Sequence, residues 1–88
     1  MLEIVYEHKF EKDLRIAKKR GLNLQKLEII ISLLSMEKPL PEKNYAHKLK
    51  GNLKNYWECH IAPNWILMYQ KTETALTLAR TGSHSDLF

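Results

Sequence analysis

Residues 55–69, NYWECHIAPNWILMY, carry the clearest sign of secondary structure in this chain. The first part of the stretch alternates with a period of two, as in a strand buried on one face: Trp57, Cys59 and Ile61 share one face, and Tyr56, Glu58 and His60 share the other. Residues 62–64, Ala-Pro-Asn, predict a turn. Residues 65–69 are apolar on both faces, which is typical of a central strand. The stretch therefore predicts a hairpin whose second strand lies inside a sheet.

The segments on either side extend this hairpin into an antiparallel meander. Residues 46–50 predict a short strand and residues 51–54 a turn. Residues 71–74 predict another turn, and residues 75–81 a last strand. At the N-terminus, residues 2–6 alternate in the same way and predict one more short strand.

Between the first strand and the meander the apolar period changes to that of a helix. Apolar residues recur every three to four positions in residues 8–20 and again after Asn23, which suits the N-cap of a second helix: Phe10, Leu14 and Ala17, then Leu27, Ile30, Ile31 and Leu34. Gly21 lies between the two helices, and the Pro39-Leu40-Pro41 segment ends the helical part. We predict an α+β fold with an N-terminal strand, a helical hairpin and an antiparallel β-meander, the helices packing on one sheet face.

Composition restricts the possible classes of protein. A chain of 88 residues forms one domain, so we treat residues 1–88 as a unit. A single cysteine, Cys59, excludes an internal disulfide and a four-cysteine zinc site. No apolar run is long enough for a bilayer and no signal peptide is evident, so we expect a cytoplasmic protein with no membrane contact. The net charge of +4 favours an anionic partner such as RNA.

The hairpins bring polar residues that are distant in sequence to one end of the sheet. A turn at 51–54 places His47 beside Glu58, and a turn at 62–64 places His60 near Trp65. A turn at 71–74 places Trp65 opposite Arg80. The residues expected to gather there are His47, His60, Asn64, Trp65, Arg80 and His84.

This group has the residue types that RNA cleavage requires. The ribose 2′-hydroxyl is the attacking group, so the enzyme must supply a base, an acid and a cation for the phosphate. Histidine serves as base or acid near neutral pH, and arginine binds phosphate. Each residue also has a non-catalytic explanation: a histidine can be an ordinary polar surface residue, Arg80 can pair with a carboxylate such as Asp86, and Trp65 can belong to the core. Four histidines without i, i+4 spacing predict no metal site, and no cofactor motif is present.

Four segments of the chain together resemble the YafQ-type toxins of the RelE/ParE superfamily. They are His47-Lys48-Leu49-Lys50-Gly51, Glu58-Cys59-His60-Ile61, Pro63-Asn64-Trp65-Ile66-Leu67-Met68-Tyr69, and Arg80-Thr81-Gly82-Ser83-His84-Ser85-Asp86-Leu87-Phe88. The resemblance covers nearly the whole chain and includes the helix of residues 9–21 and the Pro39-Leu40-Pro41 segment. It implies a RelE-like fold.

The resemblance also implies a function. Such proteins are toxins of type II toxin–antitoxin pairs that cut mRNA in the A site of the 70S ribosome, and a cognate antitoxin wraps and neutralises them. By this analogy His84 is the general acid, His47 or His60 the base or a relay partner, and Arg80 the phosphate clamp. The residues expected to bind substrate are Asn64, Trp65, Phe88, Lys48 and Lys50. Neither a metal nor a cofactor is expected.

Two departures from the family pattern leave alternatives open. Asn64 stands where the family often has Asp, and an amide cannot accept a proton as a carboxylate does. Trp57 stands where the family often has Arg. A non-catalytic toxin of the same superfamily that binds DNA gyrase is one alternative, and an RNA- or partner-binding module with weakened catalysis is another.

Overall fold

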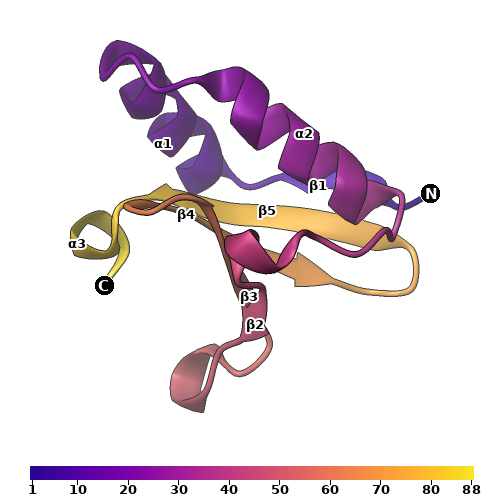
Figure 1. Ribbon diagram of the computed structural model, residues 1–88. Coiled ribbons are helices and arrows are strands. Elements are labelled where there is room, and N and C mark those ends of the chain that lie inside the picture. The colour runs from indigo at the N-terminus through magenta and orange to yellow at the C-terminus, as the bar shows by residue number, and fades with distance from the viewer.

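The computed structural model describes residues 1–88 as two helices packed on one face of a five-stranded mixed sheet, with strand order β1-β5-β4-β3-β2 (Figure 1). In chain order the elements are β1 (Glu3–Tyr6), α1 (His8–Lys19), α2 (Leu24–Ser35), a 3-10 turn (Glu42–Asn44), β2 (His47–Lys48), a second 3-10 turn (Gly51–Leu53), β3 (Trp57–Ala62), β4 (Trp65–Lys71), β5 (Ala75–Gly82) and α3 (His84–Leu87). The predicted α+β class, the helical hairpin and the meander are confirmed. None of the helices is long and apolar enough to span a membrane.

The N-terminal strand β1 pairs in parallel with β5, whereas the other neighbouring strands are antiparallel. This parallel pair makes the sheet mixed and ties the beginning of the chain to its last strand. Beyond Leu78, the last residue of β5 that pairs with β1, β5 still pairs with β4 but has no strand on its other side. That end carries Arg80 and leads directly into α3.

The core lies between the helices and the sheet. Phe10 and Ala17 of α1 and Leu27 of α2 are buried against alternate residues of the central strands. On β4 these alternate residues are Trp65, Leu67 and Tyr69. Ile66 and Met68 point to the opposite face and are buried as well, which explains why residues 65–69 are apolar throughout.

Local capping sets the limits of the helical hairpin as the sequence predicts. Asn23 is the N-cap of α2, and its side chain accepts a hydrogen bond from the Gln25 backbone N–H. Gly21 has φ +76°, the left-handed conformation that glycine adopts with little strain. Lys18 and Lys19 lie in the last turn of α1, where the helix dipole favours cations.

The predicted register is confirmed for one hairpin and wrong for another. His47 pairs with Glu58, as expected from a turn at 51–54. Arg80, however, pairs with Met68 rather than with Trp65. The β4–β5 turn lies one residue later than predicted, because the Thr72 N–H donates a hydrogen bond to the Ala75 carbonyl oxygen. This later turn shifts the pairing of β4 with β5 by two residues. A bulge between the Met68 and Tyr69 pairs shifts it by one more.

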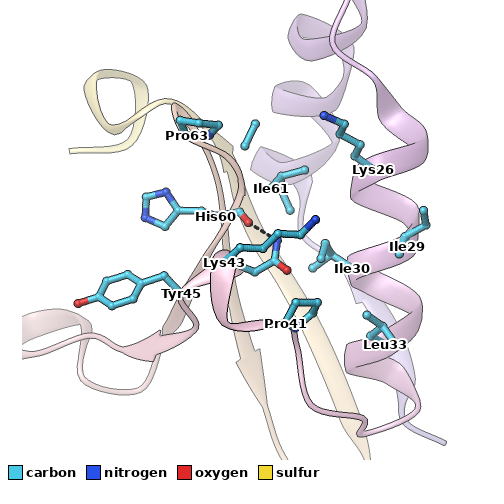
Figure 2. A pocket seen from close by; sticks show the side chains of 12 residues that line it. Lys26, Ile29, Ile30, Leu33, Pro41, Lys43, Tyr45, His60, Ile61 and Pro63 are labelled. Atoms are coloured by element: carbon cyan, nitrogen blue, oxygen red, sulfur yellow. Dashed lines mark hydrogen bonds between the residues drawn. The ribbon is translucent and has the colours of Figure 1, made fainter.

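A groove separates α2 from the segment that precedes β2 and from the end of β3 (Figure 2). Its volume is about 620 Å³, and Ile29, Ile30 and Leu33 form its α2 side. Pro41, Tyr45, His60 and Pro63 are among the residues on the other side. The groove therefore ends beside His60, one of the residues predicted to be functional.

Candidate active site

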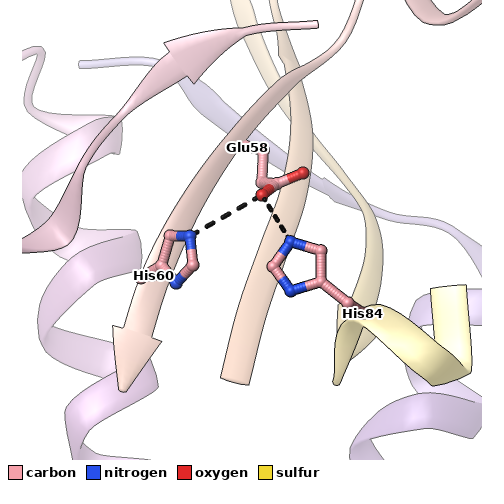
Figure 3. Close-up of side chains that lie close together, drawn as sticks. All are labelled: Glu58, His60 and His84. Carbon is pink, nitrogen blue, oxygen red and sulfur yellow. Dashed lines mark ion pairs between the residues drawn. The ribbon is translucent and has the colours of Figure 1, made fainter. Parts of the chain in front are cut away.

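Three imidazoles converge on one buried carboxylate on the sheet face that α1 and α2 leave uncovered. The Glu58 side chain is only 5% exposed. Its Oε1 lies 3.3 Å from His84 Nε2, 3.7 Å from His60 Nε2 and 3.9 Å from His47 Nε2. Figure 3 shows Glu58 between the rings of His60 and His84. These four side chains, called here the Glu58 cluster, form the centre of the site.

The sheet and α3 bring the Glu58 cluster together from separate parts of the chain. Glu58 and His60 are two residues apart on β3 and so share a face. His47 faces Glu58 across the β2–β3 pair. His84 is the first residue of α3, which begins immediately after β5. The predicted convergence of the three histidines is what the structure shows.

His47 has a defined orientation because its Nδ1 lies 3.0 Å from the Tyr45 carbonyl oxygen. A carbonyl oxygen only accepts hydrogen bonds, so Nδ1 carries the proton that is donated. In the neutral ring the lone pair is then on Nε2, the atom that faces Glu58. The backbone thus prepares His47 to accept a proton at Nε2.

A row of rings extends on both sides of the cluster. Tyr45 lies 4.8 Å from His47 and 6.1 Å from His60 between ring centroids. His60 lies 5.6 Å from His84, which lies 6.0 Å from Phe88. Tyr45 and Phe88 are 66% and 59% exposed, so the two ends of the row are open to a ligand. An unpaired RNA base stacks on such exposed rings.

Arg80 lies on the face of the Glu58 cluster but is bound by α1. Its backbone pairs with Met68, which pairs with Glu58, and directly paired residues share a face. The side chain turns to Asp13, with Nε 2.6 Å from Oδ2 and Nη2 3.1 Å from Oδ1. The hydrogen bonds to Asp13 raise the pKa of Arg80, although burial opposes this effect. The predicted alternative, that Arg80 pairs with a carboxylate such as Asp86, is confirmed in kind, but the carboxylate is that of Asp13.

The short helix α3, which begins at His84 and is followed by Phe88, is held in place through Asp86. Its Oδ2 accepts from Arg20 Nη1 at 2.8 Å and from the Ser83 backbone N–H at 3.0 Å. Ser83 Oγ accepts in return from the Asp86 N–H, which completes a capping box. The hydrogen bond from Arg20, and those from Ser83, hold the pKa of the Asp86 carboxyl well below its usual range. A helix of one turn thereby acquires a fixed position.

The other predicted substrate-binding residues differ in position. Asn64 is exposed in the β3–β4 turn, and Lys48 and Lys50 are exposed next to His47. Trp65 is 4% exposed in the core, and its Nε1–H donates to Thr81 Oγ1 at 2.9 Å. The structure therefore gives Trp65 a packing role in place of the expected stacking surface, because its ring lies on the helix-covered face.

Three residues of the site were not singled out from the sequence. Glu58 was placed on the polar face of its strand, but nothing local indicates that it becomes buried under three histidines. Asp13 lies on α1 and meets Arg80 only through the tertiary fold. Tyr45 has φ +45°, rare for a residue with a side chain, and no sequence signal marked that conformation.

Cys59, next to Glu58, is no nucleophile, because burial raises its pKa to about 12.

The Glu58 cluster also has the composition of a metal site. The ligand atoms of Glu58, His60 and His84 all lie within 4.8 Å of one another. The sequence predicted no metal site because the histidines lack helical spacing, but here the ligands come from β3 and α3. Imidazole and carboxylate together suit zinc or copper. A metal there would occupy the same atoms that acid–base chemistry uses.

Comparison with known proteins identifies the family of this chain. A family model described as the bacterial toxin of type II toxin-antitoxin system, YafQ, matches residues 2–88. The chain belongs to the YafQ toxin family. It is 38% identical over 87 residues to the mRNA interferase toxin YafQ of Escherichia coli K12, covering 98% of this chain and 95% of that protein.

Two solved structures share the fold over nearly the whole chain. The E. coli DinJ-YafQ toxin-antitoxin complex contains a chain with TM-score 0.92 and 38% identity, covering 99% of this chain and 97% of that one. A metal-bound toxin from Helicobacter pylori has TM-score 0.94 and 46% identity, with full coverage of both chains. These matches agree with the predicted RelE-like α+β fold.

Proposed function

We propose that this YafQ-family chain is the toxin of a type II toxin–antitoxin pair and an endoribonuclease that cuts mRNA by attack of the ribose 2′-hydroxyl. The observation that carries the proposal is the convergence of His47, His60 and His84 on Glu58 within 3.9 Å. Membership of the YafQ family supports the same chemistry, because the E. coli relative is an mRNA interferase toxin.

His47 is the best-prepared base in this reaction. Its Nδ1–H is held by the Tyr45 carbonyl oxygen, which leaves Nε2 to take the proton of the 2′-hydroxyl. His84 is the best-placed acid for the leaving 5′-oxygen, because its side chain is 54% exposed and lies across Glu58 from His47. His60 lies between these two histidines. Glu58 forms an ion pair with any of the three imidazoles that carries a positive charge. Glu58 thus positions all three rings.

Arg80 supplies positive charge to the phosphate as the charge builds on its oxygens. Asp13 binds Nε and Nη2 but leaves Nη1 without a protein partner. The Arg80 side chain is 29% exposed, and we assign Nη1 to a phosphate oxygen. Asp13 is accordingly a positioning residue for Arg80.

Phe88 and Tyr45 bind RNA bases on either side of the Glu58 cluster by stacking. Lys50, three residues after His47, contributes a cation for phosphate groups, and Asn64 offers an amide from the β3–β4 turn. Lys48 pairs with Trp57 and so lies on the other face of the sheet from His47, which leaves it outside the Glu58 cluster. The mRNA is taken from the A site of the 70S ribosome, which places the activity in the cytoplasm. An antitoxin is the neutralising partner, as DinJ is found with YafQ in the E. coli complex.

The test is cleavage of mRNA on programmed ribosomes by wild type, His84→Ala and His8→Ala. His8 is a matched control, since it is an exposed histidine at the start of α1 and outside the cluster. Loss of one acid–base group typically lowers the rate by about 10²–10⁴. We expect that loss for His84→Ala and none for His8→Ala.

Two outcomes would contradict the proposal. Equal amounts of intact mRNA with wild type and His84→Ala would remove the catalytic role of the cluster. Tight, salt-sensitive RNA binding by wild type without any product would favour a binding module instead. A parallel reaction with free mRNA shows whether the ribosome is required.

A further inference from the structure

Tyr45 has a backbone conformation that few residues with a side chain adopt. Its φ is +45° and its ψ is 57°, which lies in the left-handed region. The residue is also 66% exposed, so burial of the ring does not explain the conformation. A strained backbone persists only where the surrounding structure holds it, and such positions are concentrated at active sites and ligand clamps. The conformation of Tyr45 therefore points to a role in the site.

Two hydrogen bonds hold Tyr45 in this conformation. The Tyr45 N–H donates to the Glu42 carbonyl oxygen at 2.9 Å, at the end of the first 3-10 turn. The preceding residue, Asn44, is 5% exposed, and its Nδ2–H donates to the His60 carbonyl oxygen at 2.7 Å. The turn is thereby tied to β3 beside the Glu58 cluster.

Tyr45 acts on the cluster in two ways. Its carbonyl oxygen lies 3.0 Å from His47 Nδ1, which leaves His47 Nε2 to accept a proton. Its ring lies 4.8 Å from the His47 ring and 6.1 Å from the His60 ring between centroids. Figure 2 shows the Tyr45 ring projecting on the same side as the His60 imidazole. One residue thus orients the catalytic base and places an exposed ring beside it.

The chemistry of cleavage gives the row of rings a direction. The attacking 2′-hydroxyl belongs to the nucleotide on the 5′ side of the scissile phosphate, and the leaving 5′-oxygen belongs to the nucleotide on the 3′ side. The bond from the 2′-oxygen to phosphorus forms as the hydroxyl proton passes to His47. The bond from phosphorus to the 5′-oxygen breaks as His84 donates a proton. The 5′ nucleotide therefore lies at the His47 end of the row and the 3′ nucleotide at the His84 end.

We propose that Tyr45 fixes the polarity of the mRNA in the site by stacking on the base of the nucleotide whose 2′-hydroxyl attacks. Tyr45 is the ring next to His47, whereas Phe88 is the ring next to His84, at 6.0 Å. The same residue that binds this base orients His47, so the bound nucleotide and the acceptor of its proton are aligned by one turn of backbone. The proposal rests on the proposed function for the roles of His47 and His84, and it adds which nucleotide each ring takes.

The test is a double-mutant cycle between the protein and the mRNA on programmed ribosomes. The mRNA carries one abasic ribonucleotide, with its 2′-hydroxyl intact, on either the 5′ or the 3′ side of the cleaved bond. Tyr45→Gly removes the ring and suits the positive φ, and Tyr45→Asn is a second variant that tolerates this conformation. Tyr45→Phe keeps the ring. Tyr6→Ala is the matched control, because Tyr6 is 52% exposed on β1 and outside the row of rings.

On intact mRNA we expect Tyr45→Gly to lower kcat/KM about 10- to 100-fold, the range for loss of one stacked base. Tyr45→Asn should show the same loss, whereas Tyr45→Phe and Tyr6→Ala should have the wild-type value. An abasic nucleotide on the 5′ side should abolish the difference between wild type and Tyr45→Gly, and one on the 3′ side should leave it unchanged. Phe88→Ala should show the opposite dependence.

Two further measurements separate stacking from a merely structural role. Tyr45→Gly should unfold at no lower urea concentration than wild type, because glycine adopts the left-handed conformation with little strain. The Nδ1–H resonance of His47 should persist in Tyr45→Gly, since the backbone carbonyl oxygen remains. Loss of that resonance in both Tyr45→Gly and Tyr45→Asn would show that the ring acts only through His47, which would overturn the proposal.

The pattern of rates also decides against the proposal in three cases. Wild-type rates for Tyr45→Gly and Tyr45→Asn on intact mRNA would overturn it. A loss that disappears only with the 3′ abasic nucleotide would show the reverse polarity, and a loss that persists with both abasic mRNAs would show that Tyr45 contacts no base beside the cleaved bond. Failure of the proposed function is distinguishable, because wild type itself would then leave intact mRNA uncut, and the proposal would fall with it.

Discussion

Replacing Arg20 by methionine should slow mRNA cleavage far more than it destabilises the fold. Arg20, at the end of α1, binds Asp86 of α3 at 2.8 Å. The two side chains are 52% and 32% exposed, and exposed ion pairs contribute little to the free energy of unfolding. His84, however, is on the same helical turn as Asp86, so a movement of Asp86 also displaces the His84 side chain.

The size of the effect follows from the geometry of His84. Its Nε2 lies 3.3 Å from Glu58 Oε1, and a misplacement of about 1 Å at a reacting group can cost about 100-fold in rate. We therefore expect kcat at saturating ribosomes to fall by about 100-fold in Arg20→Met, with KM much less affected. Backbone amides of residues 86–88 should also exchange faster with solvent.

A double-mutant cycle isolates the Arg20–Asp86 contact. Asp86→Asn removes the charge but keeps a side-chain oxygen for the Ser83 N–H, so the capping box can persist. If the pair acts as a unit, the double variant should be no slower than either single variant. Arg20→Lys should recover part of the rate, and Lys12→Met, which removes another exposed cation of α1, should have the wild-type rate. Additive losses, or a wild-type kcat in Arg20→Met, would refute the reasoning.

The pair should remain intact over the pH range in which histidines titrate. Arg20 lowers the pKa of folded Asp86 below its unfolded value. A depressed carboxyl pKa contributes stability that is present above the unfolded pKa and lost as pH falls through the folded pKa. The pH dependence of kcat above the unfolded pKa of Asp86 should therefore not arise from detachment of α3, which amide exchange of residues 86–88 at each pH would check.

Two further predictions concern residues around the site. Trp65→Phe should lower the free energy of unfolding by about 1–3 kcal/mol, because it leaves buried Thr81 without its indole donor. Urea unfolding measures this change. A large loss of activity with unchanged stability would show instead that the indole contacts RNA. Added Cu²⁺ should inhibit cleavage by occupying the imidazoles and carboxylate of the Glu58 cluster, and a chelator should restore it; activity that is insensitive to Cu²⁺ would show that the cluster does not bind the ion.

Local periodicity was sufficient to predict most of the fold. Three predicted elements depend on short-range preferences for strand or helix, and each is present in the structure: the alternating residues 55–61, the apolar run at 65–69 and the helix capped by Asn23. The β4–β5 register could not be predicted, because it depends on the position of a turn and on a bulge. The single turn of α3 was missed because four residues show no helical period.

The site was predictable to the extent that it follows strand pairing. His47 and Glu58 were placed side by side, and the three histidines were expected at one end of the sheet. The partners supplied by α1 were not predictable, since Asp13 and Arg20 reach β5 and α3 only after the helix has packed. Trp65 could be either core or surface until the face of β4 that it occupies was known.

The parallel pairing of β1 with β5 has a consequence for the synthesis of this protein. The first strand to leave a ribosome finds its partner only after β5 has emerged, and contacts so distant in sequence form late in folding. His84 is made later still. A nascent chain therefore has no assembled Glu58 cluster until β5 and α3 have been synthesised and the sheet has closed.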